Sequence, residues 1–190
     1  PELSVWSQHF GPDHFCQDLE DWRFIGMNSE LLGSELQQEQ DQWEFLDASL
    51  ASAEHRSIGL FLHKPLFYDN IDATDINSVC VHPAPRGRLR QLVEHTNIKF
   101  MACGHTHAYH QTIWNGLEFV WCPTTAFVQP NKRWPGEAIN RAGLIEWTFT
   151  GSQVSHQVVE PARFANIDLT NWTRTSGTTI TLPPLPHRPG

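Results

Sequence analysis

The chain has 190 residues, of which 39% are hydrophobic and eight are tryptophan, so it is large enough to fold around a hydrophobic core. Its 13 Lys and Arg against 21 Asp and Glu give a net charge of −8, and no basic cluster exceeds the RGRLR run at 86–90, so we expect no nucleic-acid partner. No apolar run approaches the roughly 20 residues that span a bilayer, and we expect no membrane partner.

The first predicted elements are a strand and a helix. Residues 1–21 are rich in turn formers and aromatic residues and show no clean period. A strand begins at Trp22 in WRFIGMNSE, and the clearest helix follows in SELQQEQDQWEFLDASLASAEH. Ser34 and Gln37 have the spacing of a capping box at its start. One helix face carries four apolar side chains, Leu36, Trp43, Leu46 and Leu50.

Two further strands enclose a short helix. The apolar run from Ile58 to Leu62 is continuous, which predicts a strand covered on both faces, and it stops at His63. A polar loop at 68–85 leads to the helix RGRLRQLVEHTN, whose basic cluster we expect on the solvent face. The next strand, IKFMACG, runs directly into the turn GHTH.

The remainder of the chain predicts strands and then a tail. The segments GLEFVWCPTTAF, AGLIEWTFTG and QVSHQVVEPARF are punctuated by Gly and Pro, which indicates antiparallel pairing. The sequence from residue 173 onward, TRTSGTTITLPPLPHRPG, predicts a Pro-rich extended tail. We therefore expect one layered α/β (α+β) domain at 1–172, with sheet packed on sheet, and a tail at 173–190.

The four cysteines are widely scattered and form no C-x-x-C motif. In a chain of this length the pattern indicates reduced, mostly buried thiols, although the spacing leaves a disulfide open. The four cysteines are Cys16, Cys80, Cys103 and Cys122. The default expectation for the protein is a cytoplasmic location.

Histidines follow two of the predicted strands. His63 ends the run GLFLH, while His105 and His107 come directly after FMACG. Ligands collect beyond the carboxyl ends of the strands in α/β sheets, and Gly104 permits a sharp turn there. Imidazole is a ligand for Zn, Mn, Fe, Ni and Co. The alternative is a polar turn whose histidines only form local hydrogen bonds.

These residues resemble a known family. The segments FLHKPLF and CGHTHAY are similar to the two C-terminal metal motifs of the calcineurin-like metallophosphoesterases. His105 of the second segment lies 42 residues after His63 of the first. The preceding segments FGPDHFCQDLEDWRFIGMNSE and EQDQWEFLDASL resemble the part of the family between its middle and late motifs. The resemblance covers residues 10–150.

The resemblance implies a two-sheet sandwich flanked by helices, with two divalent metal ions, such as Mn, Fe or Zn, at the strand ends. His63 and His105 would bind one metal and His107 the other. Such a pair of cations clamps a phosphate and activates a water for attack at phosphorus. The implied activity is therefore hydrolysis of a phosphomonoester or phosphodiester, with a small phosphate ester as the partner.

The chain departs from the family pattern in its N-terminal motifs. The upstream Asp-x-His, Gly-Asp-x-x-Asp and Gly-Asn-His-Asp/Glu motifs are absent, so the general-acid histidine lies outside this chain and no catalytic residue is identifiable. Asp13 and His14 have the wrong spacing. Three carboxylates after His63 come in the wrong order and are interpreted as a solvated loop, namely Asp69, Asp72 and Asp75. The substrate-binding residues stay unknown.

We therefore expect the C-terminal portion of a metallophosphoesterase, from a truncated gene, a cleavage product or deliberate trimming. Alone it would hold metal partly or not at all and would be inactive. An alternative is a non-catalytic binding or interaction module that keeps a partial metal site, and a third is a β-rich scaffold with incidental histidines. Because half of a sandwich leaves strand edges and apolar faces uncovered, we expect a homo-oligomer or association with the missing N-terminal half.

Overall fold

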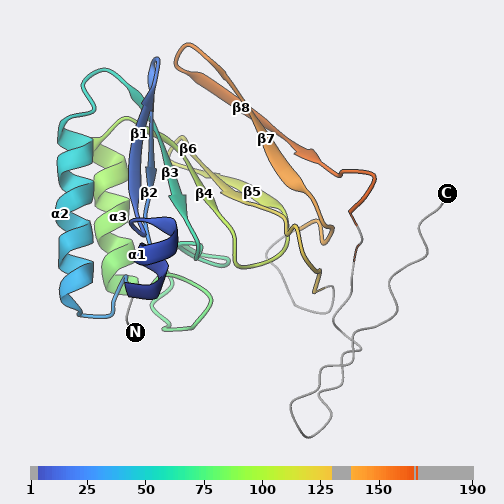
Figure 1. Ribbon diagram of the computed structural model, residues 1–190, viewed down its shortest axis with the longest axis horizontal. Coiled ribbons are helices and arrows are strands. Elements are labelled where there is room, and N and C mark those ends of the chain that lie inside the picture. The colour runs from blue at the N-terminus through green and yellow to red at the C-terminus, as the bar shows by residue number, and fades with distance from the viewer. Residues whose placement is uncertain (1–3, 130–137, 165, 167–190) are drawn as a thin grey trace, which may run out of the picture.

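Helices and two sheets form three layers in the computed structural model, which describes residues 4–129, 138–164 and 166 (Figure 1). Helices α2 (Gln37–Ala51) and α3 (Pro83–His95) lie side by side against one face of a six-stranded sheet. The hairpin of β7 (Leu144–Thr150) and β8 (Gln153–Val159) lies on the other side. The expected α/β architecture with sheet packed on sheet is confirmed. The predicted tail at 173–190 lies outside the described residues.

The six-stranded sheet has the order β1-β2-β3-β4-β6-β5. Its four central strands are parallel, which places their carboxyl ends at one edge: β2 (Trp22–Gly26), β3 (Ser57–Leu62), β4 (Ile98–Cys103) and β6 (Leu117–Trp121). The two outer strands run antiparallel to their neighbours, β1 (Phe15–Leu19) on β2 and β5 (His110–Trp114) on β6. The prediction of antiparallel pairing holds for β7 with β8, but it is wrong for β6, which lies in the other sheet and runs parallel to β4.

Two cores hold the layers together. The larger fills the space between the sheet and helices α2 and α3, and it includes Ile25, Leu46 and Leu60. The smaller is an aromatic layer under β7 and β8, where the ring of Phe100 stacks on Trp147 with centroids 4.3 Å apart. Since β3 is buried along nearly its whole length, its continuous apolar run correctly predicted a strand covered on both faces.

A glycine makes room for this aromatic layer. A Cβ atom built on Gly59 would lie 2.3 Å from the Phe100 ring, which is far inside van der Waals contact. The Phe100 ring therefore occupies the space that a side chain at position 59 would need, and any larger residue there would displace it.

Helix α2 starts differently from the sequence prediction. Its N-cap residue, Leu36, makes no side-chain cap bond, and the proposed capping box of Ser34 with Gln37 is wrong. The Glu39 carboxylate accepts hydrogen bonds from the backbone N–H groups of Gly33 at 2.7 Å and Glu35 at 2.9 Å. These bonds fold the preceding loop back over the first turn of the helix.

The burial of residues in and beside the two helices follows the prediction with two exceptions. Trp43, Leu46 and Leu89 are buried, but Leu36 is exposed at the start of α2. Arg86, expected on the solvent face of α3, is only 3% exposed because it lies in the first turn of the helix against the loop that follows β3.

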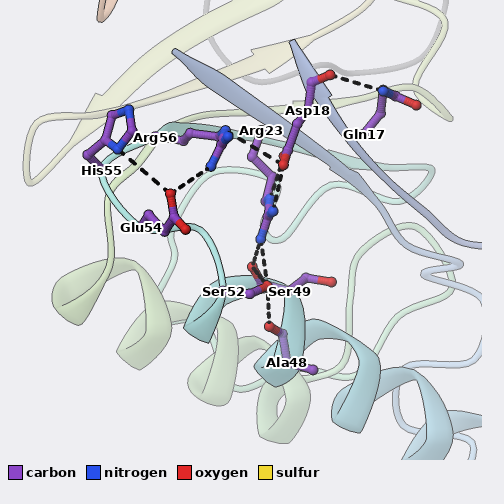
Figure 2. Close-up of polar contacts among 9 residues, drawn as sticks. All are labelled: Gln17, Asp18, Arg23, Ala48, Ser49, Ser52, Glu54, His55 and Arg56. Atoms are coloured by element: carbon purple, nitrogen blue, oxygen red, sulfur yellow. Dashed lines mark hydrogen bonds and ion pairs between the residues drawn. The ribbon is translucent and has the colours of Figure 1, made fainter. Parts of the chain in front are cut away.

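An arginine joins the β1–β2 hairpin to the end of α2, as Figure 2 shows. The guanidinium of Arg23 donates to both carboxylate oxygens of Asp18, at 2.6 and 2.8 Å. It also donates to the Ser49 carbonyl at 2.6 Å and to the Ser52 hydroxyl at 2.7 Å. This network lies at the end of the sheet opposite the predicted histidine site, so it stabilises the fold without taking part in that site.

Candidate metal centre

The parallel pairing of β3 and β4 brings two of the predicted histidines together. Leu62 is in register with Cys103, so His63 and His105 extend from the same edge of the sheet. Nε2 of His63 lies 2.9 Å from Nδ1 of His105, and the two rings are nearly perpendicular, at 85°. The two imidazoles therefore point their nitrogens at a common location.

The turn after β4 adopts a backbone conformation that is uncommon outside glycine. His105 has a φ of 66° and His107 a φ of 56°. The left-handed backbone conformation is therefore adopted by the two histidines and not by Gly104. A Cβ atom built on Gly104 would lie 3.8 Å from His63 Nδ1, which is an ordinary van der Waals contact. Strained residues of this kind cluster at binding and catalytic sites. The expectation that Gly104 supplies the turn is thus corrected.

Two residues after β2 complete this edge of the sheet. The buried hydroxyl oxygen of Ser29 accepts hydrogen bonds from the backbone N–H groups of His63 at 3.1 Å and Lys64 at 2.7 Å. One ligand atom each of Glu30, His63 and His105 lies within 4.8 Å of the others. Sequence reasoning missed Glu30, although β2 is parallel to β3 and its end reaches the same edge.

The donor set fits a divalent cation. Two nitrogens bound at about 2.1 Å and roughly 90° to one ion would lie about 3.0 Å apart, close to the observed 2.9 Å between His63 and His105. Two imidazoles with one carboxylate suit Zn, Mn or Fe. Glu30 also pairs with the Lys64 ammonium at 2.9 Å, and a carboxylate has a second oxygen to offer.

The structure places His107 apart from this cluster. It does not belong to the three-residue group, and its Nδ1 lies 2.9 Å from the Phe127 carbonyl oxygen. A hydrogen bond from Nδ1–H to that carbonyl leaves the lone pair on Nε2. A metal-binding histidine commonly has this tautomer.

Burial shifts the pKa values of two neighbouring side chains, His110 and Tyr109. Burial lowers the pKa of His110, and the nearby charge of Asp69 opposes this shift only in part. Burial also raises the pKa of Tyr109, as does the charge of Glu118. Both residues follow the histidine turn, so His110 is a neutral imidazole and Tyr109 a neutral phenol at neutral pH.

The carboxylates that the sequence analysis set aside have other partners or positions. Asp13 accepts a hydrogen bond from the Asn28 side chain at 2.7 Å and lies 3.0 Å from the ring nitrogen of His14. Asp72 pairs with Arg90 on α3. The other two loop carboxylates line a cavity, and the described residues place none of the three in a metal-binding group.

No family model matches the chain, and a search of curated proteins found no match. The solved structures to which the chain is similar include the following two. GAP50, the anchor in the inner membrane complex of Plasmodium, superposes with a TM-score of 0.63 at 11% identity over 92% of this chain and 55% of its own. Purple acid phosphatase PPD1 from yellow lupin (Lupinus luteus) seeds superposes with a TM-score of 0.56 at 17% identity over 82% of this chain and 31% of its own.

The fold is of the metallophosphoesterase type. The chain spans less than two thirds of the length of either solved chain. Over the part that the structure describes, no helix combines the length and the apolar character needed to cross a bilayer.

Proposed function

We propose that the chain belongs to the calcineurin-like metallophosphoesterases and supplies one metal-binding half of a phosphoesterase site. The observation that carries the proposal is the placement of two imidazoles and a carboxylate at the carboxyl edge of a metallophosphoesterase-type sheet. His63 and His105 are the nitrogen ligands, and Glu30 supplies oxygen. Ser29 holds His63 in place through its backbone.

The chemistry of this site suits a phosphate ester. When bound, a divalent cation supplies Lewis acidity toward a phosphoryl oxygen and lowers the pKa of a coordinated water. The ammonium of Lys64, beside Glu30, adds positive charge that attracts a phosphate dianion. We propose that His107, through Nε2, binds a second cation whose other ligands lie outside this chain. The chain alone is therefore expected to bind metal weakly and to hydrolyse little.

A second candidate function is a non-catalytic binding or interaction module that retains a partial metal site. The similarity to the anchor protein GAP50 over 92% of this chain favours it, because that fold is used there for attachment. As to location, the four free cysteines support a cytoplasmic site of action, which is likewise a proposal.

Metal content tests the proposal directly. After equilibrium dialysis against Mn²⁺ or Zn²⁺, elemental analysis should find protein-bound metal for the wild type and at least tenfold less for His105→Ala. His55→Ala is the matched control, because His55 is exposed and lies at the far end of the sheet. A wild type without metal, or a His105→Ala variant that retains it, would refute the site.

An assay of phosphate-ester hydrolysis distinguishes the phosphoesterase from the non-catalytic binding module. The metal-loaded chain is assayed with p-nitrophenyl phosphate and bis(p-nitrophenyl) phosphate, alone and with an N-terminal half supplied from a full-length homologue. Metal-dependent turnover that His105→Ala abolishes supports the phosphoesterase. Bound metal without turnover in either sample supports the binding module.

A further inference from the structure

A cavity of about 440 Å³ lies between the loop after β3 and the first turn of α3. Its wall includes the guanidinium-bearing Arg86 and the buried Cys80, and the carboxylates of Asp69 and Asp75 lie at the exposed side of the loop. A pocket of this volume holds a small molecule. It shares no residue with the group of Glu30, His63 and His105.

Arg86 is a buried charge whose side chain has no hydrogen-bond or ion-pair partner among the described residues. Its side chain is 3% exposed, and among the described residues it forms no side-chain hydrogen bond or ion pair, while its backbone N–H donates to the His82 carbonyl. A buried guanidinium ordinarily pairs with a carboxylate or phosphate, because desolvating it without compensation is costly. The Cys80 thiol beside it, whose pKa burial raises to about 11, is neutral and gives no such partner.

The cavity lining also carries negative charge. Asp69 and Asp75 both line it, and neither reaches Arg86 as an ion pair. One oxygen of Asp75 accepts from the Asn77 side chain at 2.8 Å, which fixes the carboxylate and leaves its second oxygen for a ligand. The cavity lining therefore combines a guanidinium, which donates hydrogen bonds, with two carboxylates, which accept them, and these groups do not pair with one another.

We propose that this cavity binds a small zwitterion, with its carboxylate or phosphate on Arg86 and its ammonium group on Asp69 and Asp75. A simple anion would satisfy Arg86 but would be repelled by the two carboxylates. A simple cation would meet the reverse difficulty at the guanidinium. A molecule with both charges satisfies every group, and Arg86 supplies the planar, bidentate geometry that carboxylates and phosphates accept.

Isothermal titration calorimetry with matched probes tests the charge pattern. Phosphoethanolamine carries both groups, while inorganic phosphate and ethanolamine each carry one, and β-alanine replaces the phosphate with a carboxylate. The titrations are made with EDTA present and on His105→Ala as well, so that the candidate metal centre does not contribute. We expect phosphoethanolamine or β-alanine to bind at least tenfold more tightly than either single-charge probe, and the better of the two identifies the acidic group.

Three variants locate the binding. Arg86→Met should weaken binding by about 10- to 100-fold, since it removes a charge-assisted hydrogen-bond donor. It should leave the melting temperature unchanged or higher, because it also removes a buried charge without a protein partner. The pair Asp69→Asn with Asp75→Asn should weaken binding of the zwitterion but not of inorganic phosphate. Asp72→Asn is the control, since Asp72 pairs with Arg90 outside the cavity.

The proposal is overturned if no probe binds, if inorganic phosphate binds as tightly as phosphoethanolamine, or if His105→Ala abolishes binding in EDTA. Should Arg86→Met fail to fold, the two aspartate replacements at the exposed side of the loop decide the question alone. Retention of full zwitterion affinity in that double variant would contradict the site.

Discussion

At the scale of single residues, Ser29 is a positioning residue for the candidate metal centre. Its hydroxyl oxygen is buried and accepts from two successive backbone N–H groups, those of His63 and Lys64. Replacing Ser29 with Ala leaves both donors without this acceptor and loosens the turn that aims the His63 ring. We expect Ser29→Ala to weaken Mn²⁺ or Zn²⁺ binding about tenfold, as is common for residues that orient a ligand.

The matched control for this prediction is Ser57→Ala. Ser57 is as buried as Ser29, but its hydroxyl has no hydrogen-bond partner among the described residues and it lies at the start of β3. Its loss should leave metal affinity unchanged and stability unchanged or slightly raised. Equal metal affinity in both serine variants, measured by competition with a chelating dye, would show that Ser29 does not position His63.

The sequence predicted those residues of the candidate site that follow from one rule, namely that the carboxyl ends of parallel strands share an edge of the sheet. Histidines after two parallel strands had to share an edge, and His63 and His105 do lie together. Glu30 follows a third strand of the same sheet but carries no motif, so its position became visible only with the register of β2 against β3. The positive φ values of His105 and His107 depend on tertiary contacts and could not be predicted from the sequence.

At the scale of elements, the start of α2 depends on one ionised side chain. Burial raises the pKa of Glu39, but hydrogen bonds from Gly33, Glu35 and the Trp43 indole outweigh burial, so the pKa falls below its ordinary 4.5. The stabilisation is therefore present at neutral pH and is lost as the pH falls below about 4.5. We expect Glu39→Gln to lower the free energy of unfolding by about 1 kcal/mol at pH 7.

Urea denaturation at pH 7 and at pH 3 measures this effect. The two proteins should differ at pH 7, and the difference should shrink as the pH falls through the lowered pKa of Glu39. Glu44→Gln is the control, because Glu44 lies on the exposed face of α2 and accepts only from Gln40. A difference between wild type and Glu39→Gln that persists unchanged at pH 3 would mean that charge is not the cause.

The Arg23 network makes the opposite end of the sheet sensitive to acid. The hydrogen bonds from Arg23 hold the pKa of Asp18 below its ordinary 3.8, so the bond network is intact above that pH and weakens as the pH falls through the lowered pKa. We expect Arg23→Met to lower the melting temperature by several degrees at pH 7 by calorimetry, and Arg23→Lys to restore little of it, because lysine lacks the planar fork.

An exposed arginine provides the comparison for this network. Arg141 pairs with Glu160 at 3.2 Å, and both side chains are exposed. Arg141→Met should change the melting temperature by less than a degree or so, as is usual for surface ion pairs. Equal effects of the Arg23 and Arg141 replacements would contradict a specific role for the buried network.

Elements with a strong apolar signal were predicted, and the two outer strands of the six-stranded sheet were not. The strands from Trp22 and Ile58 and both long helices appear as expected. β1 was missed because it is an edge strand with mostly exposed side chains. β5 was missed although Asn115-Gly116, both with positive φ, marks the two-residue hairpin turn that pairs it with β6.

At the scale of the whole molecule, apolar surface is concentrated at the N-terminal side. None of the residues of α1 (Ser4–Phe10) is buried, and the rings of Trp6 and Phe10 are in tilted contact, with centroids 4.6 Å apart. Phe10 is 71% exposed. The neighbouring edge strand β1 adds the exposed side chains of Phe15 and Leu19. A free strand edge beside exposed aromatic rings is the kind of surface that associates.

We propose that this surface joins two copies of the chain, in keeping with the association expected from the sequence. Light scattering coupled to size-exclusion chromatography should give a dimer mass at micromolar concentration. The double replacement Trp6→Asp with Phe10→Asp should shift it to the monomer, because burying two carboxylates in place of the rings is unfavourable. Ile113→Asp is the control, since Ile113 is 67% exposed on β5 at the other edge of the sheet. A monomeric wild type would contradict the proposal. A dimer that only Ile113→Asp dissociates would move the contact to the β5 edge.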